Sequence, residues 1–374
     1  MSDTLALLDR LVSFPTTPDR GNLALIDFVE GHLRDRGFAL TRLPDAHGEK
    51  AGIVASIGPE AGRGILLSAH SDVVPVAGQD WTRDPFALSD EGARLYGRGT
   101  TDMKGFVASV LALADRAARA DLKEPLRIVL SYDEEVGCVG IARMIDDVAA
   151  LIGRPRACVI GEPTGMQVAI GHKGKAALRA ICHGKAGHSA LAPRFVNALH
   201  VAADLVQALR GVQEELVRIG ARDAAYVIPW STVHVGQMSG GTALNIVPER
   251  AEILFEYRHL AADSPEAMRA RIDAAAARVP GRIDIEELNA YPGLDVPEQA
   301  EVVGWAKRMA RANGVTKVAF GTEAGFFAAL GLPTIVCGPG SMEGQGHKPD
   351  EYIEGSELIA CDAMMDRILQ DISQ

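Results

Sequence analysis

Residues 64–72 read Gly-Ile-Leu-Leu-Ser-Ala-His-Ser-Asp, a short apolar run that ends in polar residues. A run of this length that starts at a glycine is typical of a buried strand. Similar apolar runs occur at 126–131, 157–160 and 333–337. Apolar residues with helical spacing occur at 103–120 and 300–313. Strands that alternate with helices predict an α/β fold with a mainly parallel sheet flanked by helices.

The middle of the chain has a different pattern, which predicts an inserted α+β (ferredoxin-like) domain at residues 174–285. The discontinuous main domain would then comprise residues 1–173 and 286–374. The stretches that predict the insert are a strand at 175–183, a helix at 196–219, strands at 232–238 and 250–258, a helix at 264–279 and a closing strand near Arg282.

Charge and cysteine usage exclude several classes of function. The 374 residues have a formal net charge of −11, which argues against non-specific binding to nucleic acid or to an anionic membrane. The five cysteines form no Cys-x-x-Cys pair, which argues against a disulfide framework or a thiolate metal cluster. Asp3 and Asp9 interrupt the first apolar stretch, which predicts an amphipathic helix rather than a signal peptide. We therefore expect a cytoplasmic protein.

Potential metal ligands follow the predicted strands at the points where these strands end. In open α/β sheets, ligands bind outside the carboxyl ends of the strands. The side chains that could converge on one such crevice are His70, Asp102, Glu134, Glu135, Glu162 and His347. Imidazoles combined with carboxylates favour Zn²⁺ or a similar ion over Mg²⁺ and Ca²⁺.

Four of these six residues also have an ordinary structural interpretation. Asp102 precedes a predicted helix and by itself indicates an N-cap. Glu134 and Glu135 could be a solvated acidic pair at a helix start, and His70 could be a buried core histidine. Residues 97–99 do not form a dinucleotide-binding loop, because Asp102 stands where the third glycine would be. The joint placement of the six residues at strand ends favours the metal site.

The sequence around these residues resembles the dinuclear-zinc aminoacylase and deacetylase family of metallopeptidases along nearly the whole chain. The resemblance implies a zinc-peptidase-like catalytic domain and an inserted lid domain through which two copies form a homodimer. The motifs that support it are Ser-Ala-His-Ser-Asp-Val-Val-Pro at 68–75, Gly-Arg-Gly-Thr-Thr-Asp-Met-Lys-Gly at 97–105, Ser-Tyr-Asp-Glu-Glu-Val-Gly-Cys at 131–138, Gly-Glu-Pro-Thr at 161–164 and Gly-His-Lys-Pro-Asp-Glu-Tyr at 346–352.

The resemblance also implies a metal centre with two Zn²⁺ ions, for which Co²⁺ could substitute. His70 and Glu162 would hold one ion, Glu135 and His347 would hold the other, and Asp102 would bridge both. Separately, Asp72 would orient the His70 ring, and Glu134 would act as the general base.

His188 and Asn245 resemble the family's lid and substrate-binding positions, and Arg258 and Glu323 are further candidates from their own chemistry; the first three also have an alternative. His188 would reach the active site of the partner chain, or is a loop histidine. Asn245 would bind substrate, or belongs to a turn. Arg258 would clamp a carboxylate, or forms a surface ion pair. Glu323 could meet the cationic δ-amine of an ornithine side chain.

The resemblance implies hydrolysis of the N-acetyl amide of N2-acetyl-L-ornithine to L-ornithine and acetate, a step of arginine biosynthesis. The alternatives are desuccinylation of succinyl-diaminopimelate and a broader N-acyl amino acid amidohydrolase or dipeptidase activity. A non-catalytic protein with a structural zinc ion is disfavoured, because such sites are closed and need no free acid like Glu134.

Overall fold

The computed structural model describes residues 2–374, which divide into two compact units. Unit 1 consists of the residues up to Gly171, Asp295–Val318 and Thr322–Gln374, and unit 2 of His172–Leu294 and Ala319–Gly321. Strand β14, Arg282–Tyr291, runs through position 285, where the sequence analysis placed the second domain boundary. None of the helices in residues 2–374 is long and apolar enough to cross a membrane.

The main sheet of unit 1 is mixed, with a parallel centre, which confirms the predicted fold class. Within the described residues it has nine strands, in the order β1-β2-β6-β3-β7-β17-β8-β15, with β16 paired to β8. The neighbours β6, β3, β7 and β17 are parallel, whereas β1, β2 and β8 join antiparallel. The strands are β1 Ala39–Pro44, β2 Ala51–Ile57, β3 Ile65–His70, β6 Leu126–Ser131, β7 Ala157–Ile160, β8 Val168–His172, β15 Leu294–Asp295, β16 Val315–Val318 and β17 Thr334–Val336.

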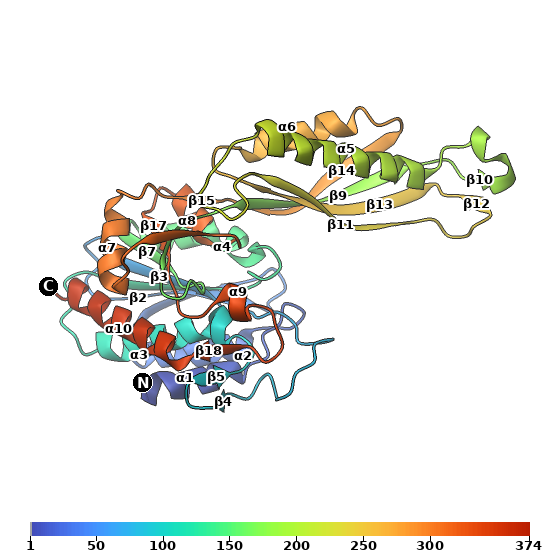
Figure 1. Ribbon diagram of the computed structural model, residues 1–374. Helices are drawn as coiled ribbons and strands as arrows, with labels where there is room; N and C mark the ends of the chain where they lie inside the picture. The colour runs from blue at the N-terminus through green and yellow to red at the C-terminus, as the bar shows by residue number, and fades with distance from the viewer. Residues whose placement is uncertain (1) are drawn as a thin grey trace. The chain divides into compact units, whose positions relative to one another are not determined.

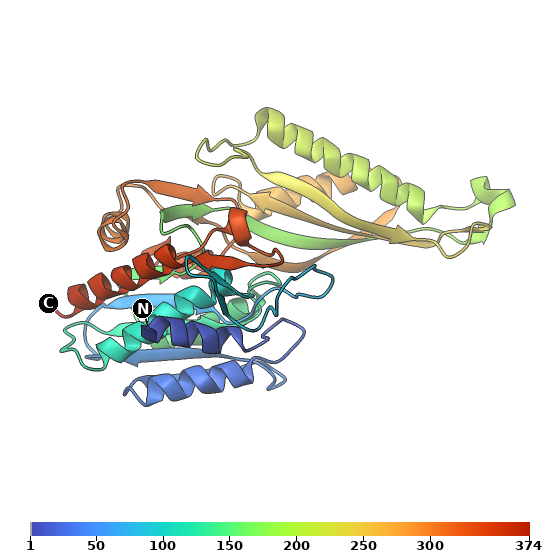
Figure 2. The ribbon, with the colours of Figure 1, turned by 60° about the horizontal axis from the view of Figure 1, so that its bottom comes forward.

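Helices cover this sheet and bury its apolar strands. Helix α3, Gly105–Ala117, is buried along most of its length, because it packs between the sheet and helices α1 and α10 (Figures 1 and 2). Every residue of β3 and β6 is buried, as expected for strands with helices on both faces. The other helices are α1 Ser2–Val12, α2 Leu23–Arg34, α4 Val139–Ile152, α7 Glu301–Ala310, α8 Ala324–Ala329, α9 Met342–Gln345 and α10 Gly355–Ile372.

A small second sheet in unit 1 joins two segments that are far apart in the sequence. Strand β18, Tyr352–Glu354, pairs antiparallel with β5, Arg94–Tyr96, and β5 also pairs with β4, Ser89–Asp90. A short irregular helix, η1 at Thr100–Lys104, follows β5 and leads into α3. The sheet thereby holds the segment before α3 next to the segment before α10.

Unit 2 has a ferredoxin-like arrangement. Its elements follow the order strand, helix, two strands, helix, strand, and its four-stranded antiparallel sheet has the order β11-β13-β9-β14. Alternate residues of β9 are buried beneath the two helices, so the strand has one apolar and one polar face. The elements are β9 Gly174–His183, α5 Ala198–Ile219, β11 Thr232–Gly240, β13 Arg250–His259, α6 Pro265–Ala276 and β14 Arg282–Tyr291.

A two-stranded ribbon extends from unit 2 beyond its main sheet. Strand β10, Gly187–His188, pairs antiparallel with β12, Ile246–Val247, and the short helix η2, Ser189–Arg194, follows β10. Leu244, between β11 and β12, is fully exposed at 100% of its surface.

Candidate metal centre

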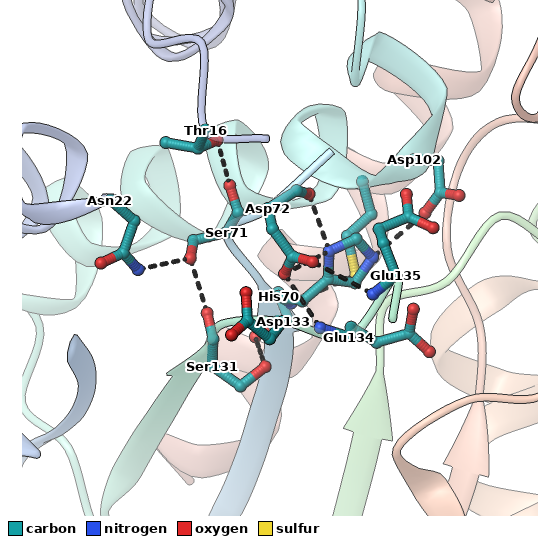
Figure 3. A network of polar contacts seen from close by, with 12 residues as sticks. Thr16, Asn22, His70, Ser71, Asp72, Asp102, Ser131, Asp133, Glu134 and Glu135 are labelled. Atoms are coloured by element: carbon teal, nitrogen blue, oxygen red, sulfur yellow. Dashed lines mark hydrogen bonds and ion pairs between the residues drawn. The ribbon is translucent and has the colours of Figure 1, made fainter. Parts of the chain in front are cut away.

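The carboxyl edge of the parallel strands gathers the predicted metal ligands. His70 is the last residue of β3 and is paired in register with Ser131, the last residue of β6. The loop after β6 carries Glu134 and Glu135, as Figure 3 shows, and Glu162 follows β7. His347 comes from the loop between β17 and β18. Parallel pairing of these strands is the reason that residues so distant in sequence meet.

The first ligand group consists of His70, Asp102 and Glu162, whose ligand atoms lie within 4.8 Å of one another. His70 Nε2 is 3.1 Å from Asp102 Oδ1 and 3.8 Å from Glu162 Oε1. All three side chains are buried. Asp102 lies inside η1 and Lys104 occupies the N-cap of α3, so the interpretation of Asp102 as the cap of that helix is wrong.

The second ligand group shares Asp102 with the first and adds Glu135 and His347. His347 Nε2 lies 3.1 Å from Glu135 Oε2 and 3.4 Å from Asp102 Oδ2. These two hydrogen bonds raise the pKa of His347 to about 10. The side chain of His347 is 53% exposed and that of His70 only 1%, so the two groups differ in how firmly packing holds them.

Asp72 connects the two sides of the centre. Its carboxylate oxygens accept the backbone N–H groups of Glu134 and Glu135 at 3.1 and 3.0 Å. His70 Nδ1 lies 3.5 Å from Asp72 Oδ1 but closer, at 3.0 Å, to the Asp72 backbone oxygen. The backbone oxygen of Asp72 is therefore the nearer partner of the His70 ring, while its carboxylate holds the loop after β6 (Figure 3).

Glu134 belongs to neither ligand group, although it precedes the ligand Glu135. Its Oε1 accepts a weak hydrogen bond from Cys138 Sγ at 3.3 Å. Burial, opposed by the charge of His70 and reinforced by that of Glu135, raises the pKa of Glu134 well above its ordinary value. A carboxyl group with a raised pKa is suited to take up and release a proton near neutral pH.

The donors of the two groups fit divalent cations. Oε1 of both Glu135 and Glu162 is buried and accepts no hydrogen bond from any residue between 2 and 374. Burial and the charge of Asp102 raise the pKa of Glu135 to about 7, and burial with the charges of Asp102 and Glu134 raises that of Glu162 well above its ordinary value. A cation would satisfy these oxygens and neutralise the excess negative charge.

Three predicted site residues lie in unit 2, and two of them are neighbours on the ribbon. His188 is exposed, and its Nδ1 accepts the backbone N–H of Ala190 at 3.1 Å. Asn245 is also exposed, and its backbone oxygen accepts the N–H of Ser189 at 3.0 Å. Arg258 lies apart on β13, where its Nε pairs with Glu256 Oε1 at 3.0 Å. This is an ion pair of the kind that the alternative interpretation of Arg258 predicted, and Nη1 of Arg258 also donates to the Tyr291 hydroxyl at 3.5 Å.

Glu323 lies in unit 1 and is buried, with 1% of its surface exposed. Its Oε1 accepts the Ser131 hydroxyl at 2.5 Å, and its Oε2 has no hydrogen-bond partner in the described part of the chain. Burial raises the pKa of Glu323 to about 7, against the hydrogen bond from Ser131. An ammonium group would have to leave water to reach this carboxyl group.

The structure also shows residues near the centre to which the sequence analysis gave no role. Glu351, Arg98 and Gln79 hydrogen bond to the segments that carry Asp102 and His347. Glu351 and Arg98 stand inside motifs quoted above, close to His347 and Asp102 in the sequence. A charged residue next to a candidate ligand within such a motif is the signal that could have indicated their role. In addition, His347 has a left-handed backbone with φ of 64°, as do Asp133 and Cys138 with φ of 55° and 56°.

Together, the mixed sheet and the two ligand groups at its carboxyl edge define a metal-dependent hydrolase. The chain belongs to Peptidase family M20/M25/M40, whose family model matches residues 66–371.

The chain is similar to curated proteins named acetylornithine deacetylase. The relative from Klebsiella pneumoniae (strain 342) is 35% identical over 343 residues, which cover 90% of this chain and 87% of the relative. The relative from Shigella sonnei (strain Ss046) is 35% identical over 342 residues, with the same coverage of both chains.

Solved structures of the family share the fold. An M20 metallo-carboxypeptidase from Sulfolobus solfataricus matches with a TM-score of 0.81 at 19% identity, covering 100% of this chain and 99% of its own. A dinuclear metal-binding M20 peptidase, YXEP from Bacillus subtilis, matches with a TM-score of 0.68 at 14% identity, covering 99% of each chain.

Proposed function

We propose that the chain hydrolyses the N-acetyl amide bond of N2-acetyl-L-ornithine and releases L-ornithine and acetate. The observation that carries the proposal is the pair of ligand groups joined by Asp102, with the unligated Glu134 beside them. The names of the relatives at 34–35% identity supply the substrate.

We propose that the two ligand groups hold two divalent cations and that both are Zn²⁺. His70 and Glu162 would hold one ion, Glu135 and His347 the other, with Asp102 between them. Bound ions of this kind would stabilise the negative charge of a developing oxyanion and lower the pKa of a bound water molecule toward neutrality. His70 is positioned for this by its contact with the Asp72 backbone oxygen.

Glu134 is the proposed general base. It would accept a proton from the attacking water and pass it to the nitrogen of the departing α-amine. Its backbone N–H donates to the Asp72 carboxylate, and this hydrogen bond fixes the backbone position from which the Glu134 side chain extends beside the ligand groups. The contact with Cys138 Sγ restrains the carboxyl group further.

The first experiment measures turnover of N-acetyl-L-ornithine, N-succinyl-L,L-diaminopimelate and N-acetyl-L-methionine by the zinc-loaded protein. We expect acetylornithine to be the best substrate. Glu134→Gln should lower kcat by about 10²–10⁴-fold while two ions per chain remain bound. Glu60→Gln, at an exposed position, is the matched control. Preferred turnover of the succinyl substrate or of acetylmethionine would overturn the substrate assignment and keep the reaction class.

Glu323 remains our candidate for recognising the δ-ammonium group of ornithine. Its buried, unpartnered Oε2 supports this role, because a cationic group would satisfy it. Glu323→Gln should lower kcat/KM for acetylornithine more than for acetylmethionine. An unchanged ratio between the two substrates would reject the assignment.

We further propose that unit 2 is a lid through which the chain forms a homodimer, with Asn245 and Arg258 binding substrate and His188 acting in the partner's active site. The exposed apolar residues Leu191, Leu244 and Ile246 on and beside the ribbon support an interface there.

We also propose a cytoplasmic location. The five free, buried cysteines fit this location, because thiols stay reduced in the cytoplasm.

Subunit mixing tests the role of His188. His188→Ala and Glu134→Gln should each be nearly inactive. A heterodimer of the two would contain one intact site, so mixing with subunit exchange should restore up to about a quarter of wild-type activity. Failure to restore activity, with heterodimers demonstrated by mass spectrometry, would place His188 outside the partner's site.

A further inference from the structure

The Glu351 carboxylate accepts hydrogen bonds from four donors, three of them backbone groups of the segment that carries Asp102. Its Oε1 accepts the backbone N–H of Thr101 at 2.8 Å and of Asp102 itself at 3.1 Å. Its Oε2 accepts the backbone N–H of Gly99 at 3.0 Å and Nη1 of Arg98 at 2.7 Å. Since Glu351 is fully buried, every one of these bonds is needed to compensate its charge.

The same network reaches the backbone of His347. Gln79 Nε2 donates to the His347 oxygen at 2.9 Å, and Gln79 Oε1 accepts Nη2 of Arg98. Arg98 Nη1 also donates to the Lys348 oxygen at 3.3 Å. Glu351 stands four residues after His347, so one buried ion pair ties together the segments of two ligands that are 245 positions apart in the sequence.

The network holds the backbone of Asp102, which both ligand groups share, and that of His347, which belongs to the second group alone, so the second group depends on it through two ligands and the first through one. His70 and Glu162 are fixed by burial, with side-chain exposures of 1% and 3%. His347 is half exposed, so packing restrains its side chain less than that of His70 or Glu162. Besides the contacts of its Nε2 with Asp102 and Glu135, hydrogen bonds to the backbone oxygens of His347 and Lys348 hold it in place. They come from Gln79 and from Arg98, which pairs with Glu351.

We propose that Glu351, with Arg98 and Gln79, is a positioning residue that sets the metal affinity of the second ligand group, Asp102, Glu135 and His347. This inference rests on the proposed metal centre. A glutamine at position 351 keeps the shape of the side chain but presents an amide N–H to donors that need an acceptor. Either Arg98 and the Gly99 N–H or the N–H groups of Thr101 and Asp102 then lose their acceptor, and the η1 backbone shifts relative to His347.

The test is metal binding by the full-length Glu351→Gln protein at buffered free Zn²⁺, with bound ions counted by mass spectrometry and second-site geometry followed by Co²⁺ absorption. The matched control is Glu354→Gln, three residues along, because the Glu354 carboxylate makes an exposed ion pair with Arg94 at 2.9 Å. We expect wild type and Glu354→Gln to bind two ions. Glu351→Gln should bind the second about 10–100-fold more weakly and the first with a smaller loss, because Asp102 belongs to both groups whereas His347 belongs only to the second.

Equal affinity of Glu351→Gln and wild type for both ions would overturn the inference, as would an equal weakening of both sites, which a merely structural role predicts. Gln79→Ala, which removes the bond to the His347 oxygen and leaves the ion pair intact, carries the same expectation if Glu351→Gln does not fold. Failure of the wild-type chain to bind two ions would instead reject the proposed metal centre itself.

Discussion

Asp72 shows how much one side chain contributes to the centre without belonging to a ligand group. Its carboxylate accepts two backbone N–H groups, and a buried acceptor of this kind fixes the loop that presents Glu134 and Glu135. We expect Asp72→Asn to lower kcat by about 10–100-fold, because the amide can accept only one of the two bonds. Activity assays with bound-metal analysis check this, and Asp84→Asn at an exposed turn is the control.

His172 gives a prediction on pH and stability. It is buried, and burial lowers its pKa to about 4 despite the hydrogen bond from Nδ1 to the Lys173 oxygen. The unfolded chain therefore binds more protons between pH 6.5 and 4, so stability falls as the pH falls through that window.

The expected loss is about 2 kcal/mol between pH 7 and pH 5. Urea unfolding at the two values measures it. His172→Asn, which keeps a donor for the Lys173 oxygen, should reduce the pH dependence, whereas His200→Gln at an exposed position should not. An identical pH dependence in His172→Asn and wild type would contradict the assignment.

At the same scale, the sequence predicted which side chains would meet but not what positions them. His70, Asp102, Glu135, Glu162 and His347 follow predicted strands or stand before a helix, and the structure gathers them. The bonds of Glu351 are different, because they depend on the pairing of β18 with β5. Those strands have three residues each and too little periodicity for their partner to be inferred.

Among the elements, helix α5 is stabilised at its N-terminus by one capping side chain. Asn197 is its N-cap, and the side-chain oxygen accepts the N–H of Leu199 at 2.9 Å. Asn197→Ala should destabilise the protein by about 1 kcal/mol, since a backbone N–H loses its partner. Urea unfolding tests this, with Asn313→Ala at an exposed position as the control. Equal midpoints for the two variants would show that the cap contributes nothing measurable.

Strand β14 explains why one predicted boundary fell inside an element. Its exposed and half-buried residues alternate from Arg282 to Glu286, and a bulge between Glu287 and Asn289 then shifts the register with β9. A bulge interrupts the period of two on which a sequence-based strand assignment depends. By contrast, β9 and β13 alternate without interruption, and their predicted ranges agree with the structure to within a residue.

On the scale of the whole molecule, the described residues form two hydrophobic cores that share no residue, one in each unit. The ligand groups lie in unit 1 alone. We therefore expect two calorimetric transitions, of which only one moves when a chelator removes metal. Its midpoint should fall by about 5 °C or more, because metal that binds the folded unit stabilises it by mass action.

A variant in the other core identifies the second transition. Leu178→Ala, at a fully buried position of β9, should lower the midpoint that the chelator leaves unchanged. A single transition that responds to both changes would show that the chain unfolds as one cooperative unit.

The left-handed backbones of Asp133, Cys138 and His347 restrict which sequences can form this centre at all. Side chains branched at Cβ are strained in that conformation, whereas glycine, asparagine and aspartate tolerate it. Consider a library randomised at position 133 and expressed in cells whose growth depends on the activity of the protein. Variants with asparagine or glycine should survive the selection, while those with valine, isoleucine or threonine should be depleted. Mutational tolerance around the centre is thus limited by backbone shape as well as by chemistry, and that limit would apply even to residues that never touch a substrate.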